Sequence, residues 1–139
     1  KMFVKGKDDY YFDFNKIIPM PKELSPDLVT SPPQNDVEKK RAAKNIKKYG
    51  YATWYEWCVE EWGTKWNACN TYIDWDEDFN IYFTFQTAWS PPEPVIKALV
   101  EKYKLLTFSG QITEESNAFM GIMGGKNGVY IREFIEPIS

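Results

Sequence analysis

Three aspartates at alternate positions are the first side chains whose spacing suggests chemistry. Asp74, Asp76 and Asp78 are placed like the first ligands of a calcium-binding loop, because Ca²⁺ prefers carboxylate oxygens. That loop requires glycine at its sixth position and glutamate at its twelfth, where this chain has Phe79 and Phe85. The calcium motif therefore fails. A divalent-cation site for metal-dependent hydrolysis remains one hypothesis, and an acidic hairpin turn is the alternative.

Other catalytic chemistry has little support in the sequence. The chain has no histidine, so it lacks the commonest general base and zinc ligand. The two cysteines, Cys58 and Cys69, cannot form a structural zinc site alone, and we interpret them as reduced structural thiols. The segment GGKNG at 124–128 fails the phosphate-loop pattern, because Met120 and Asn127 replace its required residues. We therefore predict a protein that is not an enzyme and that needs no cofactor.

A tryptophan-rich segment provides the first candidate binding surface. Residues 50–67 read GYATWYEWCVEEWGTKWN and contain four of the six tryptophans. Aromatic side chains with a few polar groups are typical of ligand pockets and of the energetic centres of protein interfaces. The candidate partner-binding residues are Trp62, Lys65, Trp66, Asn67, Gln86 and Trp89. The alternative is that the tryptophans form the core and the polar groups satisfy nearby backbone.

The second candidate surface is basic. A predicted helix at 37–49 carries the only cluster of cations in a chain whose net charge is −3. Its candidate nucleic-acid contacts are Lys39, Lys40, Arg41, Lys44, Lys47 and Lys48, and the alternative is a solvated helix face. A sheet face with Tyr82, Thr84 and Gln86 would stack bases, but no basic residue lies between Thr71 and Glu93.

The tryptophan segment itself is predicted to be a short buried helix. Thr53 is a suitable N-cap and Glu56 completes a capping box, while Gly63 ends the helix. Helical spacing predicts one apolar stripe, formed by Trp54, Tyr55, Cys58, Val59 and Trp62. We expect the four tryptophans to dominate the core here, since each buried aromatic side chain contributes roughly 1.5–3 kcal/mol.

The remaining elements follow from periodicity, caps and turn residues. A strand at 10–15 places Tyr10, Phe12 and Phe14 on one face, and a proline-rich surface loop follows at 19–34. Asn35 or Asp36 caps the helix at 37–49, and Ser90 and Glu93 cap a helix at 91–103. Strands are predicted at 71–76, 79–88, 105–112, 118–123 and 129–135, with a hairpin turn at 124–128.

Composition sets the class of protein. The 139 residues suit one domain, and 43% hydrophobic and 17% aromatic residues are enough for a core without staples. No apolar run of about 18 residues exists and no signal peptide opens the sequence, so we expect no membrane segment.

Four blocks of sequence resemble those of a known family. They are FDFNKIIPMPKEL, WYEWCVEEWGTKWNA, FQTAWSPPEPVIKAL and LTFSG, and together they run from about Phe12 to about Gly110. This order is similar to the YubB-like family of phage and conjugative-plasmid proteins, whose members contain a ferredoxin-like domain. Members usually have one more strand and helix before the first block, which here would be shortened or missing. The resemblance implies a fold and a mobile-element context, and carries no catalytic residue.

Together these observations predict a single α+β domain over 1–139. We expect a ferredoxin-like antiparallel sheet with two helices packed on one face, and extra C-terminal hairpin strands. We expect the function of a phage or plasmid accessory protein in the cytoplasm of a bacterial host. It would bind a host or phage protein, with inhibition of a defence system as one such role. Nucleic-acid binding is the alternative, and the oligomeric state is left open.

Overall fold

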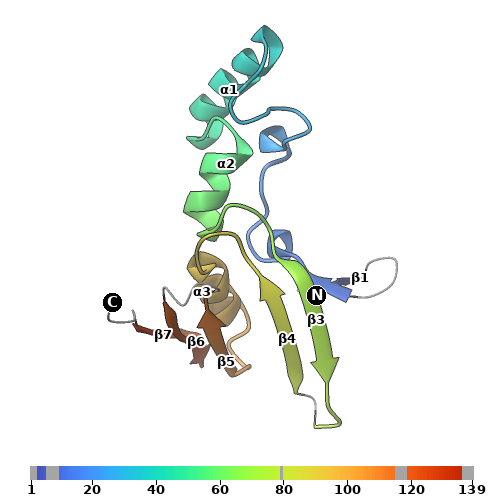
Figure 1. The fold of residues 1–139 in the computed structure, drawn as a ribbon, viewed down its shortest axis with the longest axis vertical. Helices are drawn as coiled ribbons and strands as arrows, with labels where there is room; N and C mark the ends of the chain where they lie inside the picture. Colours follow the sequence, from blue (N-terminus) through green and yellow to red (C-terminus); the bar gives the residue numbers. More distant parts are fainter. Residues whose placement is uncertain (1–2, 6–9, 79, 115–118, 136–139) are drawn as a thin grey trace. The chain divides into compact units, whose positions relative to one another are not determined.

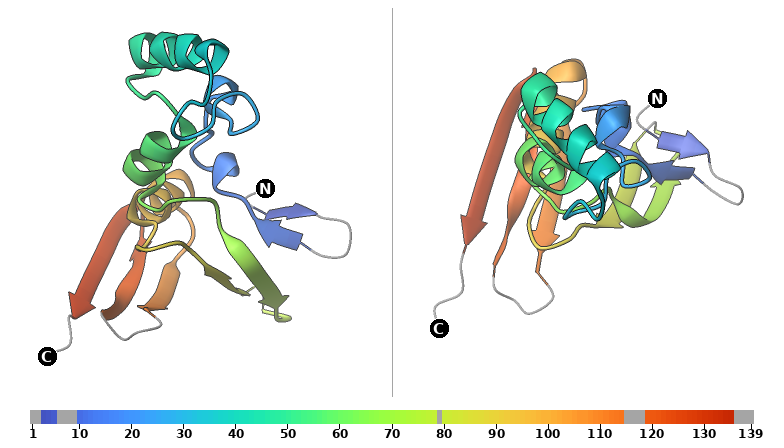
Figure 2. Two further views of the ribbon diagram at one scale, coloured as in Figure 1. Left: turned by 45° about the horizontal axis from the view of Figure 1, so that its top comes forward. Right: turned by 90° about the horizontal axis from the view of Figure 1, so that it is seen from above.

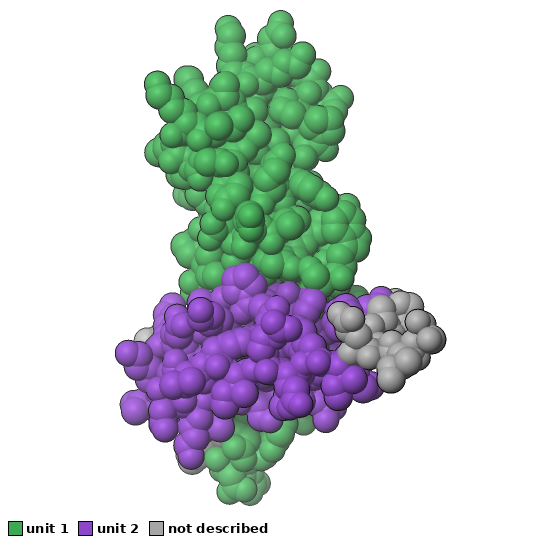
Figure 3. Space-filling model, turned by 90° about the vertical axis from the view of Figure 1, so that its left-hand side faces the viewer, with its two compact units in different colours: residues 1–90 green, residues 91–139 purple. Residues whose placement is uncertain are grey.

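The computed structural model describes residues 3–5, 10–78, 80–114 and 119–135 (Figure 1). The predicted place of Phe79 in a strand therefore lies outside the described residues, as does part of the segment at 118–123. The chain divides into two compact units, Lys1–Ser90 and Pro91–Ser139, which are coloured separately in Figure 3. Each unit combines helices with antiparallel strands, so the α+β class is confirmed.

The strands of the first unit form two short antiparallel pairs. β1 (Phe3–Lys5) pairs with β2 (Tyr10–Phe12), and β3 (Cys69–Trp75) pairs with β4 (Ile81–Gln86). The predicted strand at 10–15 stops early, because Asp13 caps a 3₁₀ turn, η1 (Phe14–Lys16), by accepting the backbone N–H of Asn15. β2 lies beside β3, and the N–H of Phe12 donates to the Thr71 hydroxyl, while no ladder joins β2 and β3 in the described residues. This side-chain contact replaces a sheet ladder between the two pairs.

An aromatic core fills the first unit. Phe12 and Phe14 are fully buried and contact each other edge to face, with ring centroids 5.3 Å apart. Phe85 lies 5.1 Å from the ring of Phe12, and Trp62 lies 5.6 Å from the ring of Phe14. Edge-to-face pairs add stabilisation beyond the apolar area that they bury. The core therefore joins β2, the β3–β4 hairpin and the tryptophan segment.

The tryptophan segment begins as predicted and then departs from a regular α-helix. Both hydrogen bonds of the capping box between Thr53 and Glu56 are present at the start of α2 (Trp54–Trp57). A turn of π-helix, η3 (Cys58–Trp62), follows, and Gly63 ends it at φ 77°, where a side chain would be strained.

The predicted apolar stripe is wrong in two places. Trp57, which the α-helical phase placed off the stripe, is only 5% exposed, whereas Val59 is 43% exposed. The wider π turn shifts the angular position of the residues around it, so a constant helical period misassigns the buried face. The four tryptophans also differ: Trp57 and Trp62 are core, Trp54 is half-buried and Trp66 is exposed.

The proline-rich loop is anchored to the helix that follows it. α1 (Asp36–Tyr49) starts with Asn35 as N-cap, as one of the two predicted caps, and ends at Gly50. The Glu38 carboxylate accepts the N–H groups of Thr30 at 2.8 Å and Gln34 at 2.9 Å, and these bonds lower the pKa of Glu38. The loop contains one short 3₁₀ turn, η2 (Lys22–Leu24), and buries the side chains of Leu24 and Val29.

The second unit is a three-stranded meander with one helix. β5 (Phe108–Thr113), β6 (Met120–Lys126) and β7 (Val129–Ile135) pair in that order, and α3 (Glu93–Lys102) contacts β6 and β7 (Figure 2). We expected one antiparallel sheet with the tryptophan helix and the 91–103 helix packed on one face. The described strands instead pair as three separate sheets, and α3 contacts the strands of its own unit.

One predicted feature at the start of this unit is wrong, and the predicted hairpin turn is present but narrower. Ser90 does not cap α3: its hydroxyl donates to the Gly63 carbonyl, and α3 begins after Pro92. The Glu93 carboxylate instead lies 3.0 Å from the Arg132 guanidinium and accepts the Tyr130 hydroxyl at 3.1 Å. The turn between β6 and β7 is also shorter than 124–128, because the strands pair as far as Lys126 and Val129.

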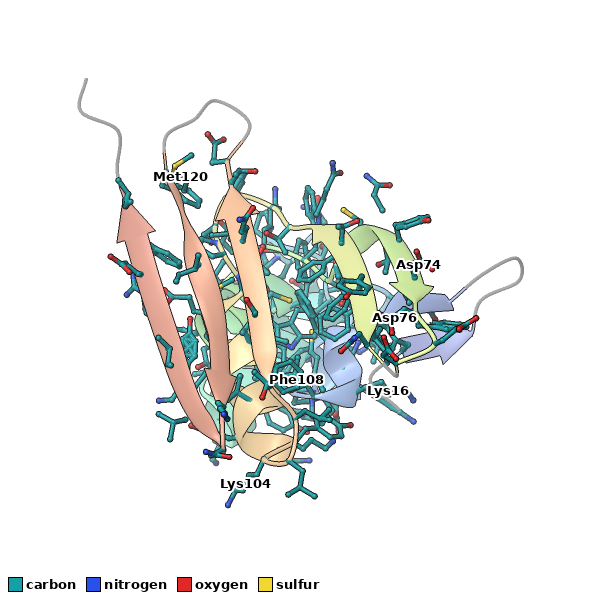
Figure 4. The ribbon with its side chains drawn as sticks, turned by 90° about the horizontal axis from the view of Figure 1, so that it is seen from below. Lys16, Asp74, Asp76, Lys104, Phe108 and Met120 are labelled. Atoms are coloured by element: carbon teal, nitrogen blue, oxygen red, sulfur yellow. The ribbon has the colours of Figure 1, made fainter. Side chains whose placement is uncertain are left out.

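Glycine in β6 has a packing reason that the turn prediction missed. A Cβ at Gly124 would stand 2.2 Å from the Phe108 carbonyl oxygen of β5. The close approach of the two strands therefore excludes any side chain there. Figure 4 shows Phe108 on β5 and Met120 at the start of β6.

Candidate binding site around Lys65

The site is an ammonium group surrounded by aromatic rings in the first unit. The Nζ of Lys65 lies 4.4 Å from the ring centroid of Trp89, 5.1 Å from that of Trp66 and 6.0 Å from that of Tyr55. Tyr55 and Trp89 also meet edge to face at 6.1 Å. Trp89 is 65% exposed and Trp66 is 46% exposed. We call these four side chains the Lys65 cluster.

The backbone beneath the Lys65 cluster is held by buried hydrogen bonds. The fully buried Thr64 hydroxyl donates to the Ala88 carbonyl at 2.6 Å and accepts the Ala88 N–H at 3.0 Å. The Ser90 hydroxyl donates to the Gly63 carbonyl on the other side of Trp89. Two segments far apart in sequence, 63–66 and 87–90, are thus fixed side by side. The indoles are therefore displayed on a rigid support.

Trp89 has a backbone conformation that side chains rarely adopt. Its φ of 74° is in the left-handed region, which costs a residue other than glycine about 1–2 kcal/mol. The cost is incurred for an indole that gains little burial in return. Strain of this kind is concentrated at functional sites, where the surrounding structure maintains it. The conformation is the main reason to treat this surface as a binding site.

The sequence segment that contains Lys65 is otherwise acidic. Lys65 is the single cation among residues 51–90, a segment that contains seven carboxylates: Glu56, Glu60, Glu61, Asp74, Asp76, Glu77 and Asp78. The Glu61 carboxylate accepts the Tyr51 hydroxyl at 2.7 Å, and this bond raises the pKa of Tyr51 to about 12. In the described part of the chain no carboxylate lies within ion-pair distance of the Lys65 ammonium.

The comparison with known families matches the half of the chain that contains most of this site. A family model described as "Ferredoxin-like domain in Api92-like protein" matches residues 61–139. The chain belongs to this family. The match confirms the expected ferredoxin-like α+β fold. Comparison with curated proteins and with solved structures gave no match.

The matched region, 61–139, contains Lys65, Trp66 and Trp89, while Tyr55 and the basic helix α1 precede it. Sequence reasoning selected the first three but missed Tyr55, which it assigned to a buried helix stripe. The available signal in the sequence was the position of Tyr55 directly after Trp54 in the tryptophan-rich segment. In the structure the two rings contact each other edge to face, with centroids 5.8 Å apart.

Three other predicted partner-binding residues have different surroundings. Trp62 is 2% exposed and its indole N–H donates to the Ile18 carbonyl at 2.8 Å. The Asn67 amide oxygen accepts the Phe14 N–H at 2.9 Å, and its amide nitrogen donates to Asp13 at 2.8 Å. Trp62 and Asn67 thus stabilise the core. Gln86 is exposed at the end of β4, where its side chain accepts from Asn70.

The basic residues of α1 form a second exposed surface. Lys39, Lys40, Arg41, Lys44, Lys47 and Lys48 are all exposed. At about 100° of rotation per residue, all but Lys39 fall within about 120° of the helix circumference. Arg41 donates to the Leu28 carbonyl at 3.0 Å, and the Lys48 ammonium lies 3.7 Å from Glu23. Hydrogen bonding to Tyr49, together with the charge of Glu23, raises the pKa of Lys48.

Asp76 and Asp78 lie in the turn of the β3–β4 hairpin, and Asp74 lies near the end of β3; Figure 4 labels Asp74 and Asp76. Asp76 shapes the turn by accepting from the backbone of Asp78 at 2.9 Å and from the backbone of Asn80 at 3.1 Å. Bonds from Asn80 lower the pKa of Asp76. Across the described ranges, no group of three or more side chains of metal-binding type comes together. The acidic turn therefore explains this spacing.

One further surface lies on the β3–β4 hairpin. Tyr82, Thr84 and Gln86 are exposed on one face of β4, with Tyr72 and Asp74 of β3 paired opposite Thr84 and Tyr82. No cation accompanies them on these strands. None of the helices in the described residues has the length and apolar character needed to cross a bilayer.

Proposed function

We propose that this protein acts by binding another protein through the Lys65 cluster. The observation that carries the proposal is the exposed indole of Trp89, held at positive φ on a support of buried hydrogen bonds. Tryptophan is enriched among the residues that dominate interface energies, because a rigid indole contributes much area at little entropic cost. Two exposed indoles with one cation between them fit this description.

The resemblance to YubB-like proteins supports a biological setting for this binding. In this setting the protein is an accessory factor of a phage or conjugative plasmid, and its partner is a host or phage protein in the bacterial cytoplasm. Inhibition of a host defence system is the role that we favour, because such inhibition needs a binding surface and no catalytic group.

The test is capture of a partner from bacterial lysate by the tagged protein. The wild type is compared with a Trp66→Ala/Trp89→Ala double variant and with Trp75→Ala, which removes another exposed tryptophan on β3. We expect a discrete partner with the wild type and Trp75→Ala, and its loss with the double variant. Capture of the protein's own copies alone, or equal capture by all three forms, would contradict the proposal. Circular dichroism checks that each variant is folded.

A second candidate function is nucleic-acid binding by α1, favoured by the single exposed arc of cations. In the described residues no carboxylate lies within ion-pair distance of Lys40, Lys44 or Lys47, so these charges are available to phosphates. A gel-shift assay at low salt tests it, with duplex DNA and single-stranded RNA as probes. Binding should fall steeply with salt and be lost on replacing these three lysines by glutamine. Replacing Lys97 and Lys104 is the matched control, and absence of any shift removes this candidate.

A further inference from the structure

The chemistry of the Lys65 cluster specifies more than the presence of a partner. Aromatic ring faces attract an ammonium group but do not accept its hydrogen bonds as a carboxylate does. Lys65 is half-buried and lies against three rings, and in the described residues it has no carboxylate partner. Its solvent-facing N–H groups are therefore available to an acceptor on another molecule.

The strongest acceptor for this ammonium is a carboxylate or a phosphate. Charge-assisted hydrogen bonds are roughly twice as strong as neutral ones, and they strengthen where neighbouring groups exclude water. The exposed indoles of Trp66 and Trp89 would cover such a bond when the partner's apolar groups pack on them. This arrangement resembles the centre of a protein interface, where contacts around an anchor keep water out.

The surrounding charges distinguish a single carboxylate from a polyanion. A nucleic-acid strand carries one phosphate per nucleotide, and the carboxylates of Glu56, Glu60 and Glu61, on the helical turns that precede Lys65, would repel it. The same carboxylates attract cations that flank one matching acidic group. Charge complementarity thus favours a partner segment with one acidic residue among apolar and basic ones.

We infer that Lys65, Trp66 and Trp89 bind a single carboxylate side chain of the partner protein, flanked by apolar and basic residues. This inference rests on the proposed function of the same surface, and it specifies the chemistry of the partner. The carboxylate accepts from the ammonium, apolar neighbours pack on the two indoles, and flanking cations face the acidic surroundings.

Blocked peptides provide a direct test. The probe is the acetylated and amidated pentapeptide Lys-Leu-Asp-Leu-Lys, and the control replaces its aspartate by asparagine. Binding is followed through the indole N–H signals of Trp66 and Trp89 in nuclear magnetic resonance titrations. We expect the aspartate peptide to bind about tenfold more tightly than the asparagine peptide. The difference should disappear in Lys65→Met and persist in Lys97→Met, which removes an exposed lysine of α3.

Three results would overturn the inference. They are equal affinity for the two peptides, absence of any shift at the two indoles, and tighter Lys65-dependent binding of oligothymidylate than of the aspartate peptide. The lysate experiment separates this inference from the proposed function. Capture that needs both indoles but survives Lys65→Met overturns the carboxylate inference alone, whereas failure of capture by the wild type counts against the proposed function.

Discussion

The first unit contains two groups of aromatic side chains with opposite environments. Phe12, Phe14 and Trp62 are buried and packed edge to face, whereas Trp66 and Trp89 are exposed around a lysine. Residue type does not distinguish the groups, since each contains tryptophan. Their positions in the chain differ: Phe12 lies on β2, Phe14 on η1 and Trp62 on η3, whereas Trp66 and Trp89 lie outside the helices and strands, and Trp89 has a positive φ. One group therefore stabilises the fold, and the other is available for recognition.

The largest expected difference between the groups is in stability. Phe14→Ala removes a fully buried ring that contacts Phe12, Trp62 and Phe85, and should lower the free energy of unfolding by about 3–5 kcal/mol. Trp66→Ala should change it by less than about 1 kcal/mol, because that indole is half in solvent. Urea unfolding followed by circular dichroism measures both. Similar losses in the two variants would break the distinction.

The two cysteines give a second contrast between interior and surface. Burial raises the pKa of Cys58 from its ordinary value of 9.0 to about 12, and Cys69 is exposed. At pH 8 the thiolate of Cys58 should be about a thousandfold scarcer than that of an ordinary thiol. Ellman's reagent should therefore label Cys69 quickly and Cys58 only after unfolding. Rapid labelling of both would show that the interior is open.

The same shift has a consequence for stability at alkaline pH. The pKa of Cys58 is higher in the folded than in the unfolded protein. Its contribution to the free energy of unfolding is therefore complete below about pH 9 and is lost as the pH rises towards 12. In Cys58→Ala that part of the pH dependence should be absent. The measurement is the urea midpoint between pH 8 and pH 11.

A smaller effect is expected where the two groups meet. Thr64→Val keeps the shape of the side chain but leaves the buried N–H and C=O of Ala88 without this partner. We expect a loss of about 2 kcal/mol in unfolding free energy, together with weaker partner capture, since the support of Trp89 is loosened. Thr84→Val, on the exposed face of β4, is the control and should be nearly neutral. A neutral Thr64→Val would show that the support is not rigid.

The smallest effect has the opposite sign. Glycine adopts a positive φ without strain, so Trp89→Gly should raise the free energy of unfolding by about 0.5–1 kcal/mol. The same variant should no longer capture the partner protein. Trp75→Gly, within β3, should instead destabilise, because glycine weakens a strand. Calorimetric melting temperatures compare the two variants. A destabilised Trp89→Gly would mean that the indole contributes to the core after all.

Local rules explain which parts of the fold were predictable. The capping box of Thr53 and Glu56, the Asn35 cap and the exposed face of β4 with Tyr82, Thr84 and Gln86 depend on residues within one turn or one strand. Short-range hydrogen bonds and side-chain periodicity decide such features, so the sequence is sufficient. The Ser90 cap failed because a distant carbonyl, that of Gly63, competes for its hydroxyl.

The candidate site was predictable only in part. Lys65, Trp66 and Trp89 were selected from their types, but with them were selected Trp62, which is buried in the core, and Asn67, which is half-buried and binds the backbone of Phe14. Nothing in residue type separates a tryptophan that seals the interior from one that is displayed. The distinction depends on contacts across dozens of residues, such as Trp62 with Ile18.

The amino-acid sequence by itself determined the α+β class, the family resemblance, the caps of α1 and α2 and the concentration of cations on α1. Tertiary structure alone decided which indoles face solvent, that Trp57 is buried just before the π turn, and that Tyr55 joins Lys65 and Trp89. The physical reason is the range of the interactions. Caps and periodicity act over a few residues, whereas burial and the strain at Trp89 are fixed by hydrogen bonds and packing between segments far apart in the chain.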